Sequence, residues 1–192
     1  MVLYLGTIIF NTILIIVVNF FFYSPIKEQF SIVEFSLAVV LLVVIEIVID
    51  IIFATIVRWI MPEKFFSIDK LYFSASKKEM RFYEKIGIKK WKDKALELGA
   101  VTGFRKNKLY SPNDNEYVKR FILEANYGIT VHVYCIVFGF LVMLANLFYP
   151  FIYVTLPIAI VNLVLNLLPI FILRYNLPKL HSLYKFNLRK QK

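Results

Sequence analysis

The sequence predicts an all-α, polytopic membrane protein with four transmembrane helices and a cytoplasmic or interfacial insert between the second and third. Hydrophobic residues make up 59% of the 192-residue chain, more than a soluble domain of this size can bury. They also gather in four long runs, which suits hydrocarbon and not water. The basic residues lie almost entirely outside these runs. We therefore expect one membrane domain over residues 1–192.

The first two predicted spans cover residues 2–23 and 35–57. The first contains no charged residue and ends at Ser24-Pro25. It lacks the basic start and the small-residue cleavage site of a signal peptide, so we expect it to be retained. The second span carries Glu46 and Asp50 inside its apolar run.

The third and fourth predicted spans cover residues 128–148 and 151–173. Their connection at Tyr149-Pro150 is so short that the two helices must be antiparallel neighbours. Omitting the first span, or treating the second as re-entrant, is the alternative topology.

The distribution of Lys and Arg residues predicts the orientation of the chain in the membrane. The insert, residues 58–127, holds 16 of the 23 Lys and Arg residues, and the tail, residues 174–192, holds 6. The remaining one is Lys27. Basic loops stay on the cytoplasmic side, so we expect a multi-pass protein of the cell membrane with both termini in the cytoplasm. This topology explains the net charge of +10 without nucleic acid, and we expect no nucleic-acid partner.

The insert combines aromatic and basic residues, as the headgroup layer favours. We expect helices over residues 78–86 and 114–124, the second starting after Ser111-Pro112. Whether the insert covers a cavity or lies on the membrane surface stays open at this point.

Glu46 and Asp50 are four residues apart and therefore share a helix face. Carboxylates are costly in hydrocarbon, so both should face protein or a water-filled cavity. They are either a catalytic, proton-carrying or cation-binding site, or protonated or paired groups that hold helices together. Arg58, two turns further on, is a candidate partner for Asp50.

His132 lies about one turn inside the third span, eight residues after Glu124. A lone His on an apolar helix is usually satisfied by a packing hydrogen bond, but Glu124 is placed to orient it as a general base. Depth along the helices predicts two polar layers: His132 with Arg174 near the cytoplasmic surface, and Asp50 with Asn166 beneath. The alternative is a snorkelling Arg174 and an amide clamp between helices.

The sequence lacks the motifs of several classes of enzyme and binding site. Cys135 is the single cysteine, which excludes an internal disulfide and a thiolate cluster, and we expect no metal. The chain contains no GxGxxG, Walker A, HExxH, GxSxG or H-x4-D motif. We therefore expect no bound cofactor.

Two stretches resemble a known family. FYEKIGIKKWKDK at residues 82–94 and NLLPIFILRYNLPKL at residues 166–180 are similar to conserved patterns of the glycosyl-4,4'-diaponeurosporenoate acyltransferase family, and GFRK at residues 103–106 resembles a third element. The resemblance runs over about residues 82–180. The chain departs from the family pattern at residues 125–129, at Leu173 and at Leu177.

The resemblance implies a small membrane enzyme that transfers a fatty acyl group. The family's named activity acylates the glucose 6-hydroxyl of a carotenoid glycoside. By resemblance, the donor is an activated acyl chain, such as acyl-CoA or an acyl carrier, and the acceptor is a hydroxyl of a membrane lipid or glycolipid.

The mechanistic hypothesis assigns catalysis to His132 as base, oriented by Glu124. The residues that we expect to bind substrate lie in or beside the matching motifs; they are Trp91, Lys92, Asp93, Arg105, Lys106, Asn166, Arg174, Tyr175 and Asn176.

Two other functions are compatible with the sequence. One is a non-catalytic membrane scaffold or a subunit of a larger complex, in which the motif residues tie insert and tail to the bundle. The other is a transporter or channel lined by Glu46 and Asp50, which four short helices achieve only with difficulty as a monomer. The oligomeric state is open.

Overall fold

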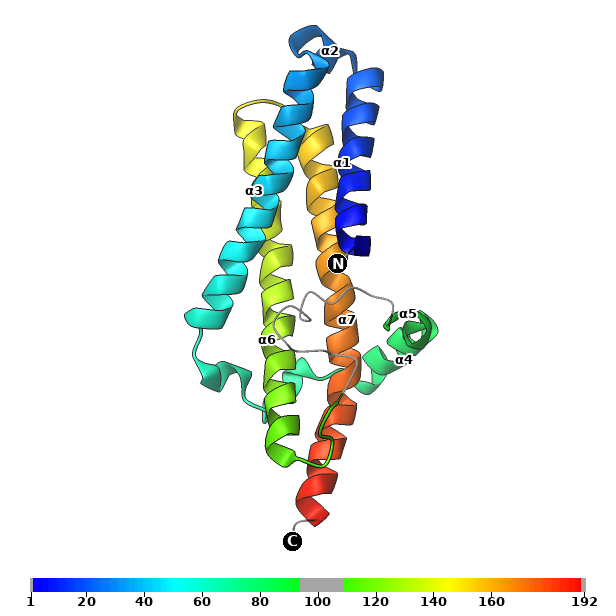
Figure 1. Cartoon of the computed structure of the whole chain (residues 1–192), viewed down its shortest axis with the longest axis vertical. Coiled ribbons are helices and arrows are strands. Elements are labelled where there is room, and N and C mark those ends of the chain that lie inside the picture. Colours follow the sequence, from blue (N-terminus) through cyan, green and yellow to red (C-terminus); the bar gives the residue numbers. More distant parts are fainter. Residues whose placement is uncertain (1, 94–108, 191–192) are drawn as a thin grey trace. The chain divides into compact units, whose positions relative to one another are not determined.

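The computed structural model describes residues 2–93 and 109–190, and Figure 1 shows the order of the elements along the chain. The structure is 84% helical, and its described residues contain no strand, which confirms the all-α prediction. The elements in chain order are α1 (Val2–Phe22), α2 (Ser24–Gln29), α3 (Ile32–Trp59), η1 (Glu63–Phe66), η2 (Leu71–Phe73), α4 (Lys77–Lys85), α5 (Ile88–Trp91), α6 (Asn115–Gly139), η4 (Phe140–Leu147) and α7 (Ile152–Lys190).

Four helical segments are long and apolar enough to cross a membrane, as the sequence predicted. They are Tyr4–Phe22, Ile32–Trp59, Asn115–Leu147 and Ile152–Lys190. The third and fourth helices extend well beyond their predicted spans, because a change from apolar to charged residues ends a hydrophobic run without ending a helix. The predicted helix at residues 114–124 is the first part of α6, and α7 continues past Arg174 through most of the predicted tail.

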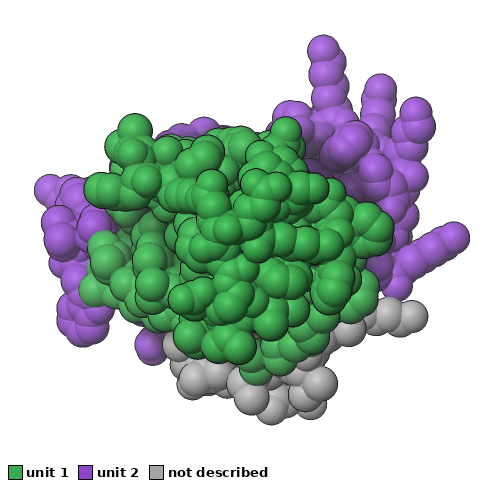
Figure 2. All heavy atoms as spheres, turned by 90° about the horizontal axis from the view of Figure 1, so that it is seen from above, with its two compact units in different colours: residues 1–55, 134–166 green, residues 56–133, 167–192 purple. Residues whose placement is uncertain are grey.

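The described chain divides into two compact units, coloured separately in Figure 2. Unit 1 comprises Met1–Thr55 and Tyr134–Asn166. Unit 2 comprises Ile56–Val133 and Leu167–Lys192. Helices α3, α6 and α7 each contribute one part to each unit.

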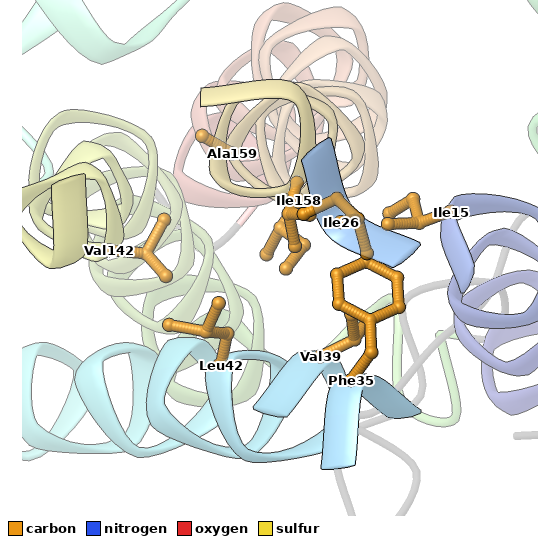
Figure 3. Packing of buried hydrophobic residues seen from close by; sticks show 9 residues of the cluster. Ile15, Ile26, Phe35, Val39, Leu42, Val142, Ile158 and Ala159 are labelled. Carbon is orange, nitrogen blue, oxygen red and sulfur yellow. The ribbon is translucent and has the colours of Figure 1, made fainter. Parts of the chain in front are cut away.

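Unit 1 has an apolar core to which five of its helical segments contribute. Side chains from α1, α2, α3, η4 and α7 point toward one another in Figure 3. The buried members are Ile15, Ile26, Phe35, Val39, Leu42, Val142, Val154, Ile158 and Ala159. The outer faces of α1 and α3 expose many large apolar side chains, such as Phe10 and Leu37, each 65% exposed. Such faces suit contact with lipid chains.

Unit 2 packs part of the insert against the charged parts of α6 and α7. Helix α4 begins with a capping box, in which Ser76 Oγ accepts from the Glu79 amide and the Glu79 carboxylate accepts from the Ser76 amide. Gly87 adopts φ +68° between α4 and α5, a conformation that glycine tolerates best. Ile88 then enters a buried cluster with Tyr83 and Tyr175.

Two of the three prolines inside α7 free backbone carbonyls that accept hydrogen bonds from other elements. A proline has no N–H, so the carbonyl four residues earlier loses its helical partner. Pro157 frees the Tyr153 carbonyl, which accepts a hydrogen bond of 3.1 Å from Asn19 Nδ2 of α1. Pro178 frees the Arg174 carbonyl, which accepts one of 3.3 Å from the Ala75 amide.

Candidate functional site

In unit 2, Glu124 and Arg58 form an ion pair through two parallel hydrogen bonds. Arg58 Nη1 and Nη2 donate to the two carboxylate oxygens of Glu124, each at 2.9 Å. The guanidinium carbon also lies 4.8 Å from the centre of the Tyr127 ring. Asn126 Nδ2, completely buried, donates to the Phe66 carbonyl at 2.9 Å and holds η1 against α6. Arg58 is therefore bound to Glu124, a pairing that the sequence did not suggest.

A cavity of about 860 Å³ opens beside Glu124. Its lining comes from η1, the segment after it, the first half of α6 and the end of α7, all within unit 2; the residues are Glu63, Lys64, Ser67, Ile68, Asp69, Glu116, Lys119, Arg120, Leu123, Glu124 and Tyr184. Helix α6 is started here by Asp114, whose Oδ1 accepts from the Glu116 and Tyr117 amides. The volume lies in the range of pockets that bind small molecules or cofactors.

The charges that line this cavity are only partly paired. Lys119 lies 3.8 Å from Glu116, a loose contact between exposed groups. Neither Lys64 nor Arg120 forms a salt bridge with another residue of the described ranges. The cavity therefore presents two cationic side chains beside the carboxylates of Glu63 and Asp69, which also form no salt bridge within the described ranges.

His132 lies on α6, eight residues after Glu124 and in the same unit. One continuous helix joins the two residues, so their backbones are about 12 Å apart along the axis. The His132 side chain is partly buried. The Glu124 carboxylate is held by Arg58, and the proposed control of His132 by Glu124 stays a prediction.

Arg174 is bound on all three of its side-chain nitrogens. Nε and Nη2 each donate to the Glu79 carboxylate at 3.0 Å, Nη1 donates to the Tyr72 carbonyl at 2.9 Å, and Nη2 also reaches the Ser74 carbonyl at 3.3 Å. The backbone carbonyl that Pro178 frees binds Ala75. Two groups of Arg174, its guanidinium and the backbone carbonyl that Pro178 frees, thus both hold the segment 72–79 against α7.

The other motif residues gather around Tyr175, which is fully buried. The ammonium groups of Lys179 and Lys92 lie 4.1 Å and 5.9 Å from the centre of its ring. Trp91 Nε1 donates to the Ile86 carbonyl at 3.2 Å, which braces the turn between α4 and α5. The two stretches that resemble the family therefore meet in one packed layer of α4, α5 and α7.

Two predicted residues add less to this geometry, and two others fall outside the described residues. Asn176 is partly buried on α7, and Asp93 is exposed just after α5. Arg105 and Lys106 lie outside the residues that the structure describes.

In unit 1, Asp50 and Asn166 meet as predicted. Asp50 Oδ2 accepts from Asn166 Nδ2 and Asp50 Oδ1 from Asn162 Nδ2, each at 3.3 Å. Asn166 Nδ2 also contacts Asn162 Oδ1 at 2.6 Å. Glu46 lies one turn earlier on α3 and is 5% exposed. The amide clamp between α3 and α7 is thus present, and it contains a carboxylate.

Glu79 is the important residue that the sequence reasoning missed. Burial opposes its ionisation, but hydrogen bonds from Ser76 and the charge of Arg174 outweigh burial and hold its pKa below the usual value. The pattern Ser76-x-x-Glu79 is a capping-box signature, so the residue was detectable as a helix start. Its second bond, to Arg174, had no local signal.

Two further pKa shifts occur in this layer. Burial raises the pKa of the Tyr83 phenol, with Glu79 adding to the effect. The hydrogen bond and charge of Glu84, whose Oε1 lies 3.2 Å from Nζ, raise the pKa of Lys89. Lys89 therefore stays a cation at neutral pH. Among the residues in the described ranges, no group of three His, Cys, Asp or Glu is placed to hold a metal ion.

Fold and site together define a helical membrane protein with a charged cavity beside its basic insert. Comparison with protein families then gives a particular assignment. The model of the glycosyl-4,4'-diaponeurosporenoate acyltransferase family matches residues 62–185, and the chain belongs to this family. No curated protein and no solved structure matches the chain.

Proposed function

We propose that the protein is a membrane-embedded acyltransferase that moves a fatty acyl group from an activated donor to a hydroxyl of a membrane lipid or glycolipid. Family membership supports acyl transfer. The observation that carries the proposal is the cavity of about 860 Å³ beside Glu124, whose lining residues all lie within the matched region. The acceptor class follows from the apolar helices, because a lipid reaches such a protein without leaving the membrane.

The donor enters the Glu124 cavity in this proposal. Acyl-CoA and acyl carrier protein both present phosphate groups, and Lys64 and Arg120 are the cations of the lining that lack a salt-bridge partner among described residues. The basic insert also raises the local concentration of an anionic donor. Lys64 and Arg120 thus replace Arg174 as the proposed donor grip, because the nitrogens of Arg174 already bind protein groups.

The chemical step requires a base near the acceptor hydroxyl. His132 accepts the hydroxyl proton as the acceptor oxygen attacks the thioester carbonyl, which forms the new ester C–O bond. The C–S bond then breaks, and the thiolate leaves with the proton from His132. Glu124, fixed by Arg58, orders the cavity wall, and Arg174 acts as a positioning residue that holds α4 against α7.

We propose that this chemistry takes place at the cytoplasmic leaflet of the cell membrane, with both termini inside. The support is the concentration of 22 of 23 basic residues in the insert and the tail. A soluble donor and a membrane-bound acceptor meet at that boundary.

The test is acyl transfer by the purified full-length protein in lipid nanodiscs, with radiolabelled acyl-CoA and an extracted lipid acceptor. We expect His132→Ala to lower kcat at least about 100-fold, since a general base contributes that much or more. Lys64→Ala with Arg120→Ala should raise the KM for the donor. Lys78→Ala, an exposed basic residue outside the cavity lining, is the matched control. Full turnover by His132→Ala would rule out His132 as the base. An unchanged KM for the donor in the variant that combines Lys64→Ala with Arg120→Ala would rule out the cavity as the donor site.

A non-catalytic scaffold is the second candidate, favoured by one observation. Arg174, Tyr175 and Trp91 all bind or pack against other parts of unit 2, as a purely structural motif would. Absence of turnover with every donor, together with a partner that copurifies with the wild-type chain and is lost in Arg174→Ala, supports this function over the enzyme.

A further inference from the structure

A second polar site lies wholly within unit 1, and it is independent of the proposed acyl transfer. Helix α3 supplies Glu46 and Asp50, and α7 supplies Asn162 and Asn166. The Cys135 thiol of α6 contacts the Asp50 carbonyl at 3.7 Å. Three helices thus turn polar groups toward one point inside an apolar segment of the protein.

Asp50 is well satisfied at this site without a positive charge. Its two carboxylate oxygens accept one amide hydrogen bond each, from Asn162 and Asn166. Both donors are neutral, so they solvate the carboxylate and leave its charge uncompensated.

Glu46, unlike Asp50, is buried without hydrogen-bond donors for its carboxylate among the described residues. Its side chain is 95% removed from solvent, with 5% exposure, and neither carboxylate oxygen accepts a well-formed hydrogen bond from a described residue. Asn162 Nδ2 is the donor beside it, but its two hydrogens go to Asp50 Oδ1 and to the Cys135 carbonyl. A buried carboxylate without a partner requires a ligand or a proton.

Gly139 shows how closely the surrounding helices approach the carboxylate. A Cβ at this position would lie 2.5 Å from Glu46 Oε1 and closer still to Asn162 Nδ2. The backbone of α6 therefore closes one side of the site, and the remaining open side faces α1.

A cavity of about 40 Å³ lies on that open side. It has room for one ion or a few water molecules. Oxygen-bearing and apolar side chains line it, and the described part of the chain contributes no Lys, Arg or His to the lining; the polar members are Tyr4, Asn11, Thr12, Glu46, Asp50 and Asn162. Asn11 Nδ2 and Thr12 Oγ1 donate to the Thr7 and Ile8 carbonyls, and the side-chain oxygens of these two lining residues are still able to act as acceptors.

We propose that this cavity binds a monovalent metal cation, with Glu46 as the principal ligand and Asp50 and the α1 oxygens completing the site. Two carboxylates, amide and hydroxyl oxygens and no basic side chain form the donor set of a hard cation. The cavity of about 40 Å³ leaves room for a single ion, and Glu46 is the one carboxylate of the lining whose oxygens accept no hydrogen bond from a described residue. The bound cation joins α1 to α3 and α7.

The experiment measures the thermal unfolding of the full-length protein in nanodiscs in NaCl, KCl and choline chloride at equal ionic strength and neutral pH. We expect NaCl or KCl to raise Tm by about 3 °C over choline, as a ligand at some ten times its Kd does for a chain of this length. Glu46→Gln should abolish the difference. Glu28→Gln, an exposed carboxylate of α2, is the matched control and should keep it.

Binding of ²²Na⁺ to the wild-type protein provides a second readout that does not depend on the folding of a variant. Saturable binding, competed by NaCl and not by choline, supports the site. Equal Tm in all three salts with no bound ²²Na⁺ overturns the proposal. So does a Tm that rises on acidification without any cation dependence, because a proton then neutralises Glu46. A response to Mg²⁺ or Ca²⁺ alone overturns the monovalent assignment. Each result is independent of acyl transfer.

Discussion

Units 1 and 2 satisfy their carboxylates in different ways. In unit 2, Glu124 and Glu79 meet the guanidinium groups of Arg58 and Arg174, and these side chains are between 21% and 48% exposed. In unit 1, Asp50 meets two neutral amides, and Glu46 is 5% exposed. Ion pairs therefore occur where water reaches them, and the buried apolar unit uses amides to avoid desolvating a second full charge.

In both units, a proline in α7 nevertheless frees a backbone carbonyl that binds another element. Pro157 in unit 1 and Pro178 in unit 2 each free the carbonyl four residues earlier, and another element donates to each freed carbonyl. In unit 1 the donor is the Asn19 side chain, and in unit 2 it is the Ala75 backbone. A broken helical hydrogen bond thus serves as a binding point in both settings.

The largest effect should come from the Arg174 pair. Arg174→Ala removes every hydrogen bond to Glu79, Tyr72 and Ser74, and we expect it to lower the free energy of unfolding by about 3 kcal/mol. Arg58→Ala removes a more exposed pair and should cost about 1 kcal/mol. Denaturant titration in mixed micelles, followed by tryptophan fluorescence, measures both.

Arg174→Lys is the control for this comparison, because it keeps the charge but loses the two-pronged contact with Glu79. We expect it to recover less than half of the loss. Equal destabilisation by Arg174→Ala and Arg58→Ala would show that exposure does not set the difference between the two pairs.

The next largest effect should distinguish the two units through their glycines on α6. In Gly139→Ala the new Cβ collides with the Asn162 amide and Glu46, and overpacking of this kind costs about 2 kcal/mol. In Gly128→Ala the Cβ meets only the tip of the Leu173 side chain at 3.0 Å, which can rotate. Since alanine also favours the helix, we expect a net change within about 0.5 kcal/mol.

Thermal unfolding of the two glycine variants in nanodiscs checks this expectation. Gly6→Ala serves as a further control, because nothing lies within 4 Å of its added Cβ. A Gly139→Ala protein as stable as the wild type would mean that α6 does not pack against the Glu46 site as closely as the structure shows.

The smallest effect should be a pH dependence of the segment 72–79 in unit 2. The pKa of Glu79 is lowered from 4.5, so the folded state favours its ionised form. Its contribution to stability is therefore complete above pH 4.5 and is lost as the pH falls through the lowered pKa. Limited proteolysis of the segment 72–79 at pH 7 and pH 3.5 should show faster cleavage at the lower pH, after correction for protease activity.

Glu79→Gln is the matched variant for the pH experiment. It should be cleaved faster than the wild type at pH 7 and should respond less to acid. A wild type and a Glu79→Gln variant with the same pH response would assign the effect to another group.

The sequence by itself determined the four apolar helices, the concentration of basic residues in insert and tail, and the meeting of Asp50 with Asn166. These follow from hydropathy, charge and helical spacing, which are local properties of the chain. The motif resemblance also identified the family correctly, because the matching stretches carry their pattern in the letters alone.

Only the tertiary structure decided which groups meet across elements. Arg58 binds Glu124 across 66 residues, and Arg174 binds Glu79 across 95. Neither carboxylate oxygen of Glu46 accepts a well-formed hydrogen bond from a residue of the described ranges, and the amide hydrogens of Asn162 go to Asp50 and Cys135. The hydrogen-bond partner of a side chain depends on which helices pack together and on how many donor hydrogens each side chain has. The spacing of residues along one helix does not predict this.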